Sequence, residues 1–352
     1  MATEQNATYA TTDAVSHRFI DTNGLRMHLA EQGPTINQDT CPPGRVPTVP
    51  LILLCHGFPE LWYSWRYQLP ALAQAGYHVV APDLRGYGQT DQPDAIEAYT
   101  LLHLVGDLVG VLDVLGERQA ILVGHDWGSV LAWNAALMRP DRFPALITMS
   151  VPYLPRGPLH GPRATIPPTK SWKKALGDHF FYQAYFQQPG VAEAELEGDV
   201  RTSMRRFLYG LSGDAPLSER WHPVLPDPQA SLLNSAGNPA SLPSWLTEAD
   251  LDVYTAEFER TGFRGGLNWY RNIDRNWELL AAYSGASIPQ PTLFLLGDQD
   301  PTLEGMGGSK QIERMQRFVP NLRQTVLPGC GHWIQQERAQ EVNAAILAFL
   351  QR

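Results

Sequence analysis

The 352-residue chain has few cysteines, no long apolar run and no excess of positive charge. Its three cysteines, Cys41, Cys55 and Cys330, are odd in number and form no closely spaced metal-binding pair, which predicts a protein of the reducing cytoplasm. No apolar run approaches the ~20 residues of a transmembrane helix, and residues 1–15 lack the apolar core of a signal peptide. The formal net charge of -9 offers no basic surface for nucleic acid or an anionic membrane.

Hydrophobic residues make up 43% of the chain, which is enough to form a large core. Its length suits one large domain, or one domain with an insertion. The prolines gather at 42–50, 152–168 and 216–243, which predicts loops there. The loop at 36–48 resembles an insertion whose role the sequence does not reveal, and residues 1–15 predict a loose tail.

Short apolar segments alternate with helical patterns over the first 152 residues. We expect strands at 17–23, 25–31, 49–55, 77–82, 119–123 and 146–151. We expect helices at 64–75, 101–115 and 129–139. Asn23-Gly24 between the first two strands is typical of a hairpin turn. This alternation predicts βαβ units and a mostly parallel sheet flanked by helices.

From about residue 153 the alternation stops, and no convincing strand follows until residue 292. We expect helices there at 171–186, 193–211, 247–260 and 267–283, the third with Thr247 and Asp250 in capping-box spacing. The alternation resumes with strands at 292–296 and 325–327 and helices at 308–318 and 338–350. The sequence therefore predicts an α/β core formed by 1–152 and 286–352, with an inserted helical cap at 153–285.

The motif Gly124-His125-Asp126-Trp127-Gly128 lies between a predicted strand and a predicted helix. This setting is typical of a nucleophile elbow, although the central residue is usually Ser and here is Asp126. A carboxylate needs no base to become a nucleophile, and its attack on carbon gives an ester. A His base must then direct water at that ester. Asp126 could instead be only a helix N-cap, and this motif alone leaves both interpretations open.

Two further groups follow predicted strands, at the sheet edge where this class of fold binds its ligands. Asp300 follows the strand at 292–296, and His332 follows the last strand in a Gly-rich turn. The order nucleophile, acid, His is that of hydrolases with this architecture. Asp300 would hold the His332 ring and stabilise its cation. Asp298 remains the alternative acid.

The motif His56-Gly57-Phe58-Pro59 follows the third predicted strand. Backbone N–H groups of this loop and of the residue after the nucleophile form the oxyanion hole in such folds. We expect the N–H groups of Phe58 and Trp127 to stabilise the oxyanion formed during ester hydrolysis. His56 and His125 are interpreted as structural.

These motifs resemble those of epoxide hydrolases of the α/β-hydrolase fold, over roughly residues 17–350. The resemblance extends to 83–88, Asp-Leu-Arg-Gly-Tyr-Gly, and to two cap stretches at 182–193 and 262–272. It implies that Tyr182 and Tyr270 hydrogen-bond the epoxide oxygen, because phenols can polarise this oxygen and supply a proton. Tyr185, on the same predicted helical face as Tyr182, is the alternative tyrosine. We expect no cofactor and no metal.

The expected substrate is a small hydrophobic epoxide in an aromatic-lined pocket. The residues expected to bind it are Phe58, Pro59, Trp127, Phe180, Gln183, Phe186 and Trp333. The nearest rival function is a haloalkane or fluoroacetate dehalogenase with the same nucleophile. A serine esterase is excluded because Ser does not occupy the elbow, and a non-catalytic scaffold would lack a triad member. We expect a monomer or homodimer, and the sequence does not specify which epoxide is used.

Overall fold

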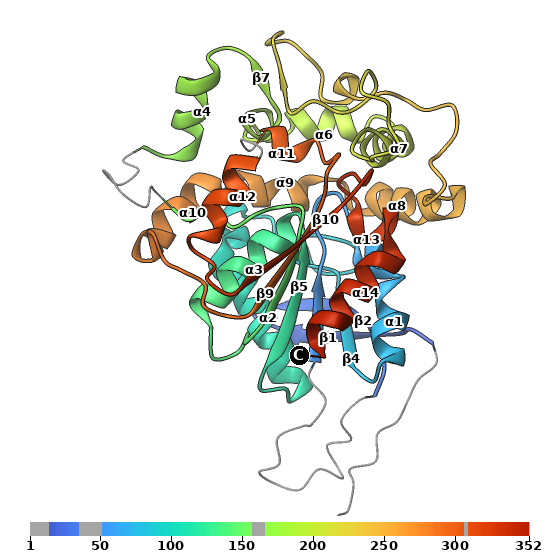
Figure 1. Ribbon diagram of the computed structural model, residues 1–352. Helices are drawn as coiled ribbons and strands as arrows, with labels where there is room; N and C mark the ends of the chain where they lie inside the picture. The colour runs from blue at the N-terminus through green and yellow to red at the C-terminus, as the bar shows by residue number, and fades with distance from the viewer. Residues whose placement is uncertain (1–13, 35–50, 157–165, 306–308, 352) are drawn as a thin grey trace, which may run out of the picture.

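An eight-stranded, mostly parallel sheet forms the centre of the protein (Figure 1), and the computed structural model describes residues 14–34, 51–156, 166–305 and 309–351. The strands lie in the order β1-β2-β4-β3-β5-β6-β9-β10. Their bounds are β1 Ser16–Thr22, β2 Leu25–Gln32, β3 Leu51–Cys55, β4 His78–Pro82, β5 Ala120–His125, β6 Leu146–Met149, β9 Thr292–Gly297 and β10 Leu322–Leu327. β2 pairs antiparallel with β1 and β4, and the other neighbours are parallel.

The expected hairpin and buried strands are confirmed. Asn23 and Gly24 join β1 to β2 with φ angles of 45° and 77°, the left-handed conformation that a two-residue hairpin loop requires. β3 and β4 are buried along their whole length. Such strands can be continuous apolar runs because both faces of a parallel sheet are covered by helices.

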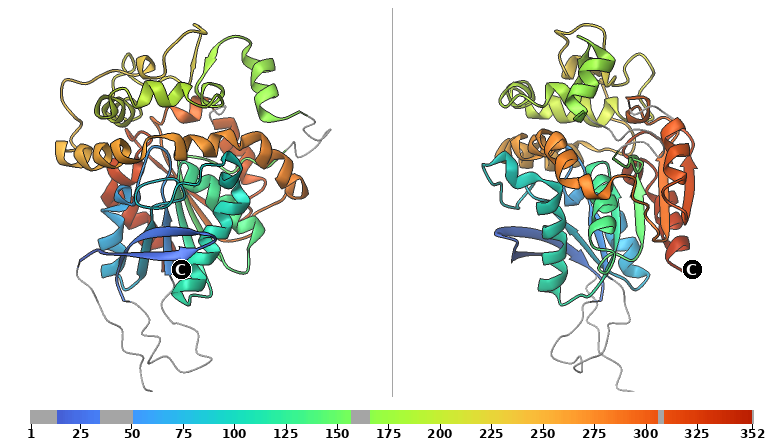
Figure 2. Two further views of the ribbon diagram at one scale, coloured as in Figure 1. Left: turned by 180° about the vertical axis from the view of Figure 1, so that it is seen from behind. Right: turned by 90° about the vertical axis from the view of Figure 1, so that its left-hand side faces the viewer.

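Helices pack on both faces of this sheet (Figure 2). α2 Leu101–Leu115 and α3 Trp127–Met138 contribute Leu104, Leu108 and Leu131 to one buried apolar cluster. α1 Gln68–Gln74 and α14 Ala339–Leu350 contribute to a second cluster on the opposite face, with Leu69 and Ile346 among its members. Shorter helices are η1 Trp62–Trp65, η2 Ile96–Tyr99, α11 Thr302–Gly305, α12 Ser309–Gln316 and α13 Ile334–Glu337.

β6 and β9 are neighbours in the sheet although the chain leaves it between them. The intervening elements lie beyond the carboxyl ends of the strands, with α8 to α10 in a row beside the sheet and α4 to α7 farther out (Figures 1 and 2). Their bounds are α4 Pro168–Leu176, β7 Phe180–Phe181, α5 Tyr182–Tyr185, α6 Val191–Leu196, α7 Val200–Gly210, β8 Val224–Leu225, η3 Leu233–Ser235, α8 Glu248–Thr261, α9 Arg264–Arg271, α10 Ile273–Leu279 and η4 Leu280–Tyr283. The division at 152 and 285 into core and cap stays a prediction.

The expected helices of this region are corrected in three places. The segment 171–186 is not one helix, because α4 ends at Leu176, before Gly177 with its left-handed φ of 60°, and β7 follows and pairs with β8. The segment 193–211 divides at Asp199, whose carboxylate caps α7 by accepting the Thr202 N–H. The segment 267–283 divides into α9, α10 and η4. The capping box of Thr247 and Asp250 on α8 is confirmed.

Two expectations fall mainly on residues that the structure does not describe, namely the tail at 1–15, of which residues 14 and 15 are described, and the insertion at 36–48. Within the described ranges, no helix is both long and apolar enough to cross a membrane.

Candidate active site

Asp126 occupies the sharp turn between β5 and α3. Its φ of 50° and ψ of -118° are unusual for a residue with a side chain, and such backbone strain is typical of functional turns. The Asp126 carbonyl accepts the N–H groups of Ser129 and Val130 at 3.0 and 3.2 Å, which fixes the turn to the start of α3. A Cβ at Gly128 would collide with the backbone oxygen of Cys55, so this close approach requires glycine.

The Asp126 carboxylate lies between a backbone donor and a histidine. Oδ1 accepts the Phe58 N–H at 2.9 Å, and Oδ2 lies 3.7 Å from His332 Nε2. Burial raises the pKa of Asp126 above its ordinary value, against the opposing effects of the charges of His332 and His125 and the N–H groups of Phe58 and Trp127. One oxygen therefore accepts the N–H of Phe58, one of the two predicted oxyanion donors, and the other lies near the predicted base.

His332 and Asp300 form a buried pair beside Asp126. His332 Nδ1 lies 3.0 Å from Asp300 Oδ2, while Asp300 Oδ1 accepts the N–H and the hydroxyl of Thr302 at 2.9 and 2.7 Å. Burial disfavours the imidazolium, but the charge and hydrogen bond of Asp300, together with Asp126, raise the pKa of His332 to about 9. Burial also opposes ionisation of Asp300, yet the charge and hydrogen bond of His332 keep the Asp300 pKa below its ordinary value.

The alternative acid, Asp298, lies elsewhere. Its side chain is exposed, and Oδ1 accepts the Gly329 N–H at 2.7 Å. The structure thus places Asp300, and not Asp298, against His332. Thr302 was not singled out in the sequence, although an Asp side chain in a turn often accepts the backbone N–H two residues further on, as Asp300 does here.

Beneath the nucleophile, Glu60 and His125 form a second buried pair that the sequence did not reveal. Glu60 Oε2 lies 2.7 Å from His125 Nδ1 and accepts the Gly57 N–H at 2.7 Å, while His125 Nε2 lies 2.7 Å from the His332 carbonyl oxygen. Burial opposes ionisation of Glu60, but the charge and hydrogen bond of His125 lower its pKa to about 2. Both nitrogens of His125 face acceptors, so this ring supports the turn and the backbone of His332.

The other motif histidine, His56, is also tied to backbone. Its Nε2 accepts the Leu84 N–H at 3.0 Å, and Nδ1 donates to the Gly57 carbonyl at 2.9 Å. Neither nitrogen is free for chemistry. Within the described residues, no cluster of three or more His, Cys, Asp or Glu side chains could hold a metal ion.

Two tyrosines from the segment between β6 and β9, Tyr182 and Tyr270, line the same pocket as Asp126. The ring centroids of Tyr182 and Tyr270 are 6.1 Å apart, and that of Tyr270 is 5.0 Å from Trp127. Burial raises the pKa of both phenols, so each keeps its proton at neutral pH. Gln183 Nε2 donates to the Tyr182 oxygen at 2.7 Å, which leaves the Tyr182 proton available to a ligand.

Tyr185, the alternative tyrosine, is directed elsewhere. Its hydroxyl donates to Glu195 at 2.7 Å, and Tyr185 does not line the described pocket. The three groups that the structure brings together at the pocket are therefore Asp126, Tyr182 and Tyr270.

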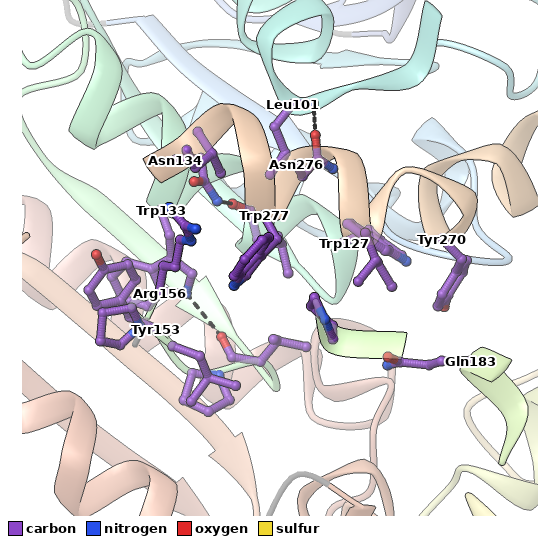
Figure 3. A pocket seen from close by; sticks show the side chains of 18 of the residues that line it. Leu101, Trp127, Trp133, Asn134, Tyr153, Arg156, Gln183, Tyr270, Asn276 and Trp277 are labelled. Carbon is purple, nitrogen blue, oxygen red and sulfur yellow. Dashed lines mark hydrogen bonds between the residues drawn. The ribbon is translucent and has the colours of Figure 1, made fainter. Parts of the chain in front are cut away.

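The pocket has a volume of about 600 Å³, within the usual range for small-molecule sites (Figure 3). Of the residues expected to bind substrate, Trp127 and Gln183 line it, and Figure 3 shows both near Tyr270. The remaining five, which do not line it, are Phe58, Pro59, Phe180, Phe186 and Trp333.

The residues that do not line the pocket are buried behind its wall. The Phe58 ring packs against Phe186 and Tyr270, so Phe58 contributes its N–H rather than its ring. Trp333 is fully buried, and its indole N–H donates to the Leu208 carbonyl at 2.9 Å. Phe181, rather than Phe180, reaches the pocket, because adjacent residues of a strand such as β7 point to opposite sides.

Comparisons with known proteins agree with this geometry. Residues 50–339 match the family model described as alpha/beta hydrolase fold. The chain is 46% identical to epoxide hydrolase A of Mycobacterium tuberculosis, covering 96% of this chain and 98% of that protein. It is 42% identical to epoxide hydrolase 3 of Siraitia grosvenorii, covering 97% and 99%. Among solved structures, an epoxide hydrolase from an endophytic Streptomyces gives a TM-score of 0.86 at 47% identity, covering 96% of this chain and 95% of that one.

Proposed function

This chain belongs to the epoxide hydrolases of the α/β-hydrolase fold, and from that premise we propose that it converts an epoxide to a vicinal diol through an ester on Asp126. One observation carries the proposal. Asp126 has one oxygen on the Phe58 N–H and the other near His332, and the two protonated phenols of Tyr182 and Tyr270 line the same pocket.

In the first step, Asp126 Oδ2 attacks one epoxide carbon, and the C–O bond of the ring breaks. The leaving oxygen gains negative charge, which the phenol O–H groups of Tyr182 and Tyr270 stabilise and then neutralise by giving up a proton. Because the leaving oxygen stays attached to the substrate, the product of this step is a hydroxyalkyl ester of Asp126.

In the second step, His332 takes a proton from water, which attacks the carbonyl carbon of the ester. The negative charge develops on Oδ1, which already accepts the Phe58 N–H, and the Trp127 N–H also hydrogen-bonds the Asp126 carboxyl group. Asp300 stabilises the imidazolium that forms. Collapse of the intermediate breaks the ester bond to the substrate oxygen, which takes up a proton and completes the diol, and the water oxygen remains on Asp126. Of the two protons of the water, one completes the diol and the other, held by His332, returns to the phenolate, so that His332 is neutral and Asp126 ionised again.

The tyrosine pair distinguishes epoxide opening from halide displacement, since a halide leaving group needs no proton. The family relationship does not favour the dehalogenase alternative. We also propose a reducing compartment, in line with the cytoplasmic location expected from the sequence. Its support is that Cys55 and Cys330 are buried free thiols. Whether the protein is a monomer or a homodimer stays a prediction.

Replacing both Tyr182 and Tyr270 by Phe should nearly abolish ester formation, since no O–H would remain for the leaving oxygen. Each single variant should slow this step by up to ~10²–10³-fold, the loss typical of one oxyanion donor, while the other phenol still acts. Stopped-flow tryptophan fluorescence should follow the step, because Trp127 adjoins the nucleophile. Tyr185→Phe is the matched control. A double variant that opens styrene oxide at the parent rate would contradict the role of these phenols.

Asp300→Asn should slow ester hydrolysis by about 10⁴-fold, because the imidazolium of His332 would lose its carboxylate. Asp298→Asn should change it little, since Asp298 faces Gly329. Single-turnover measurements of ester decay would compare the two variants. A larger loss in the Asp298 variant would show that the acid has been assigned to the wrong residue.

The pH dependence of ester decay should report the neutral form of His332, because only this form can accept a proton. In the free protein the charges of Asp300 and Asp126 raise the His332 pKa to about 9. Esterification removes the charge of Asp126, so the apparent pKa of decay should lie below that of the free protein. The rate should rise with pH and level off below pH 9. Decay that continues to rise beyond the His332 pKa measured by NMR in the free protein would contradict this.

A further inference from the structure

The loop that carries His332 is held by the segment that follows α7. The His332 N–H donates to the Leu211 carbonyl at 2.9 Å. The two backbones also touch directly, because a Cβ at Gly331 or at Gly213 would collide with the backbone of the other segment. Residues 211–213 belong to the region inserted between β6 and β9. The loop of the base is therefore packed against the predicted cap as well as against the sheet.

Glu337, the last residue of α13, joins these two segments. Its Oε2 accepts the N–H groups of Gly331 at 2.9 Å and Gly213 at 3.0 Å, and its Oε1 accepts the Trp333 N–H at 3.1 Å. Two of these donors flank His332 in the chain, and the third comes from the predicted cap. The side chain is buried, so its removal would leave these N–H groups without their acceptor.

The other contacts of His332 hold different atoms of the residue. Its carbonyl oxygen accepts the Ser150 hydroxyl at 3.0 Å and lies 2.7 Å from His125 Nε2, while Asp300 holds the ring at Nδ1. Glu337 adds the peptide groups before and after the residue. Because a displacement of about 1 Å can slow a catalytic step by ~10²-fold, the position of the His332 ring depends on this loop staying in place.

We propose that Glu337 is a positioning residue for ester hydrolysis, which fixes the His332 loop against residues 211–213 and so makes the predicted cap part of the machinery of that step. This inference rests on the proposed function, because it takes His332 to be the base that activates water. Glu337 does not line the described pocket, so the proton transfers stay with His332 and Asp300.

Ester formation should be independent of Glu337, because α9 with Tyr270 is anchored to the core elsewhere. The Trp269 indole N–H donates to the Arg85 carbonyl at 3.0 Å. The Asn272 amide donates to the Ile96 carbonyl at 2.6 Å. These two contacts flank Tyr270 in the chain. Loss of Glu337 should therefore affect the second step of the reaction and spare the first.

The test is Glu337→Gln, which keeps the size of the side chain but leaves one oxygen for three donors. In single turnovers of styrene oxide, ester decay should slow by ~10²-fold, as expected for a misplaced base, while ester formation keeps the parent rate. In the steady state kcat and KM should fall together, because the ester accumulates. A loss of folded protein would instead lower kcat at unchanged KM. Glu337→Asp should keep part of the decay rate, because a carboxylate remains.

The matched control is Glu31→Gln, at a carboxylate of β2 with the same exposed fraction of 8%. Glu31 pairs with Arg18 at 3.0 Å and lies 3.3 Å from His78, outside the described pocket. This variant should lower the unfolding temperature without changing the rate of ester decay.

The link to the predicted cap is tested from its own side by Ser212→Ala. The Ser212 hydroxyl accepts the Trp245 indole N–H at 3.1 Å and the Asp214 N–H at 3.2 Å, which fixes the segment that carries Gly213. Ser212→Ala should slow ester decay less than Glu337→Gln does. The double variant should lose less than the product of the two single effects, since both act through Gly213. Effects that multiply would overturn the link to the cap.

A folded Glu337→Gln protein that hydrolyses its ester at the parent rate would overturn the proposal. A fall in kcat at unchanged KM, equal in the Glu337 and Glu31 variants, would overturn it too, since the effect would then be one of stability. If Glu337→Gln does not fold, Glu337→Asp and Ser212→Ala carry the same comparison. No ester and no diol from the parent protein would contradict the proposed function itself.

Discussion

An Asp126→Ala variant should lose turnover by on the order of 10⁶-fold, the loss measured when the nucleophile of a covalent hydrolase is deleted. The remaining groups cannot replace it, because His332 alone has no carboxylate through which to form an ester. Diol production from styrene oxide, followed by chromatography, would measure the loss. Asp126→Asn is the companion variant, because Asn tolerates the positive φ of 50° at this turn better than Ala. Both variants should be inactive, and the Asn variant should unfold near the parent temperature.

The source of the new oxygen atom in the diol gives a direct test of the role of Asp126 as nucleophile. With enzyme in excess and solvent enriched in ¹⁸O, the first diol should carry no label, because its new oxygen comes from Asp126 Oδ2. Repeated turnovers should place ¹⁸O in the peptide that contains Asp126, and then in the diol. Label in the diol of the first turnover would show that water attacks the epoxide directly, and the ester mechanism would be wrong.

A His332→Gln variant should react once with an epoxide and then stop. Ester formation needs only Asp126 and the phenols, whereas ester hydrolysis needs a base, so steady-state turnover should fall by on the order of 10⁶-fold. Mass spectrometry should find one substrate mass added to the peptide that contains Asp126. The variant removes a cation 3.7 Å from Asp126, so the ester should also form somewhat more slowly.

The control for His332→Gln is a matched change at another buried histidine, His56→Gln, which should accumulate no ester because His332 remains. Should a folded His332→Gln protein bind epoxide without gaining its mass, the two-step scheme would be contradicted. Should it turn over near the parent rate, His332 would not be the base.

The strands of the sheet could be predicted from the sequence, and so could the order of the nucleophile, acid and histidine motifs along the chain. Both depend on local sequence patterns. Buried parallel strands are continuous apolar runs, and glycines mark the turns after β3, β5 and β10. Asp300 could be placed after β9, but its choice over Asp298 depended on which side chain turns inward. In the structure this depends on Thr302 and His332, two contacts that spacing alone does not specify.

The residues of the pocket wall were harder to predict, because they lie on short segments whose secondary structure was predicted wrongly. A single helix over 171–186 would place Phe180 and Gln183 on one face. The left-handed Gly177 and the two-residue strand β7 change the direction of every side chain that follows, so Phe181 reaches the pocket instead. Arg156, which also lines the pocket, gave no local signal at all, because its environment comes from Trp277 and Ser284, distant in sequence.

The close approach of Gly128 to the Cys55 backbone has a counterpart on the other side of the nucleophile, where a Cβ at Gly57 would collide with the Asp126 side chain. For anyone diversifying this enzyme, positions 57 and 128 are therefore poor targets. In a saturation library at either codon, active clones should be recovered almost only with the glycine retained. Randomised codons for Ile273 and Leu280 on the pocket wall should instead yield many active clones with altered enantiomer preference. Screening should therefore target the pocket wall rather than the glycines around the nucleophile turn.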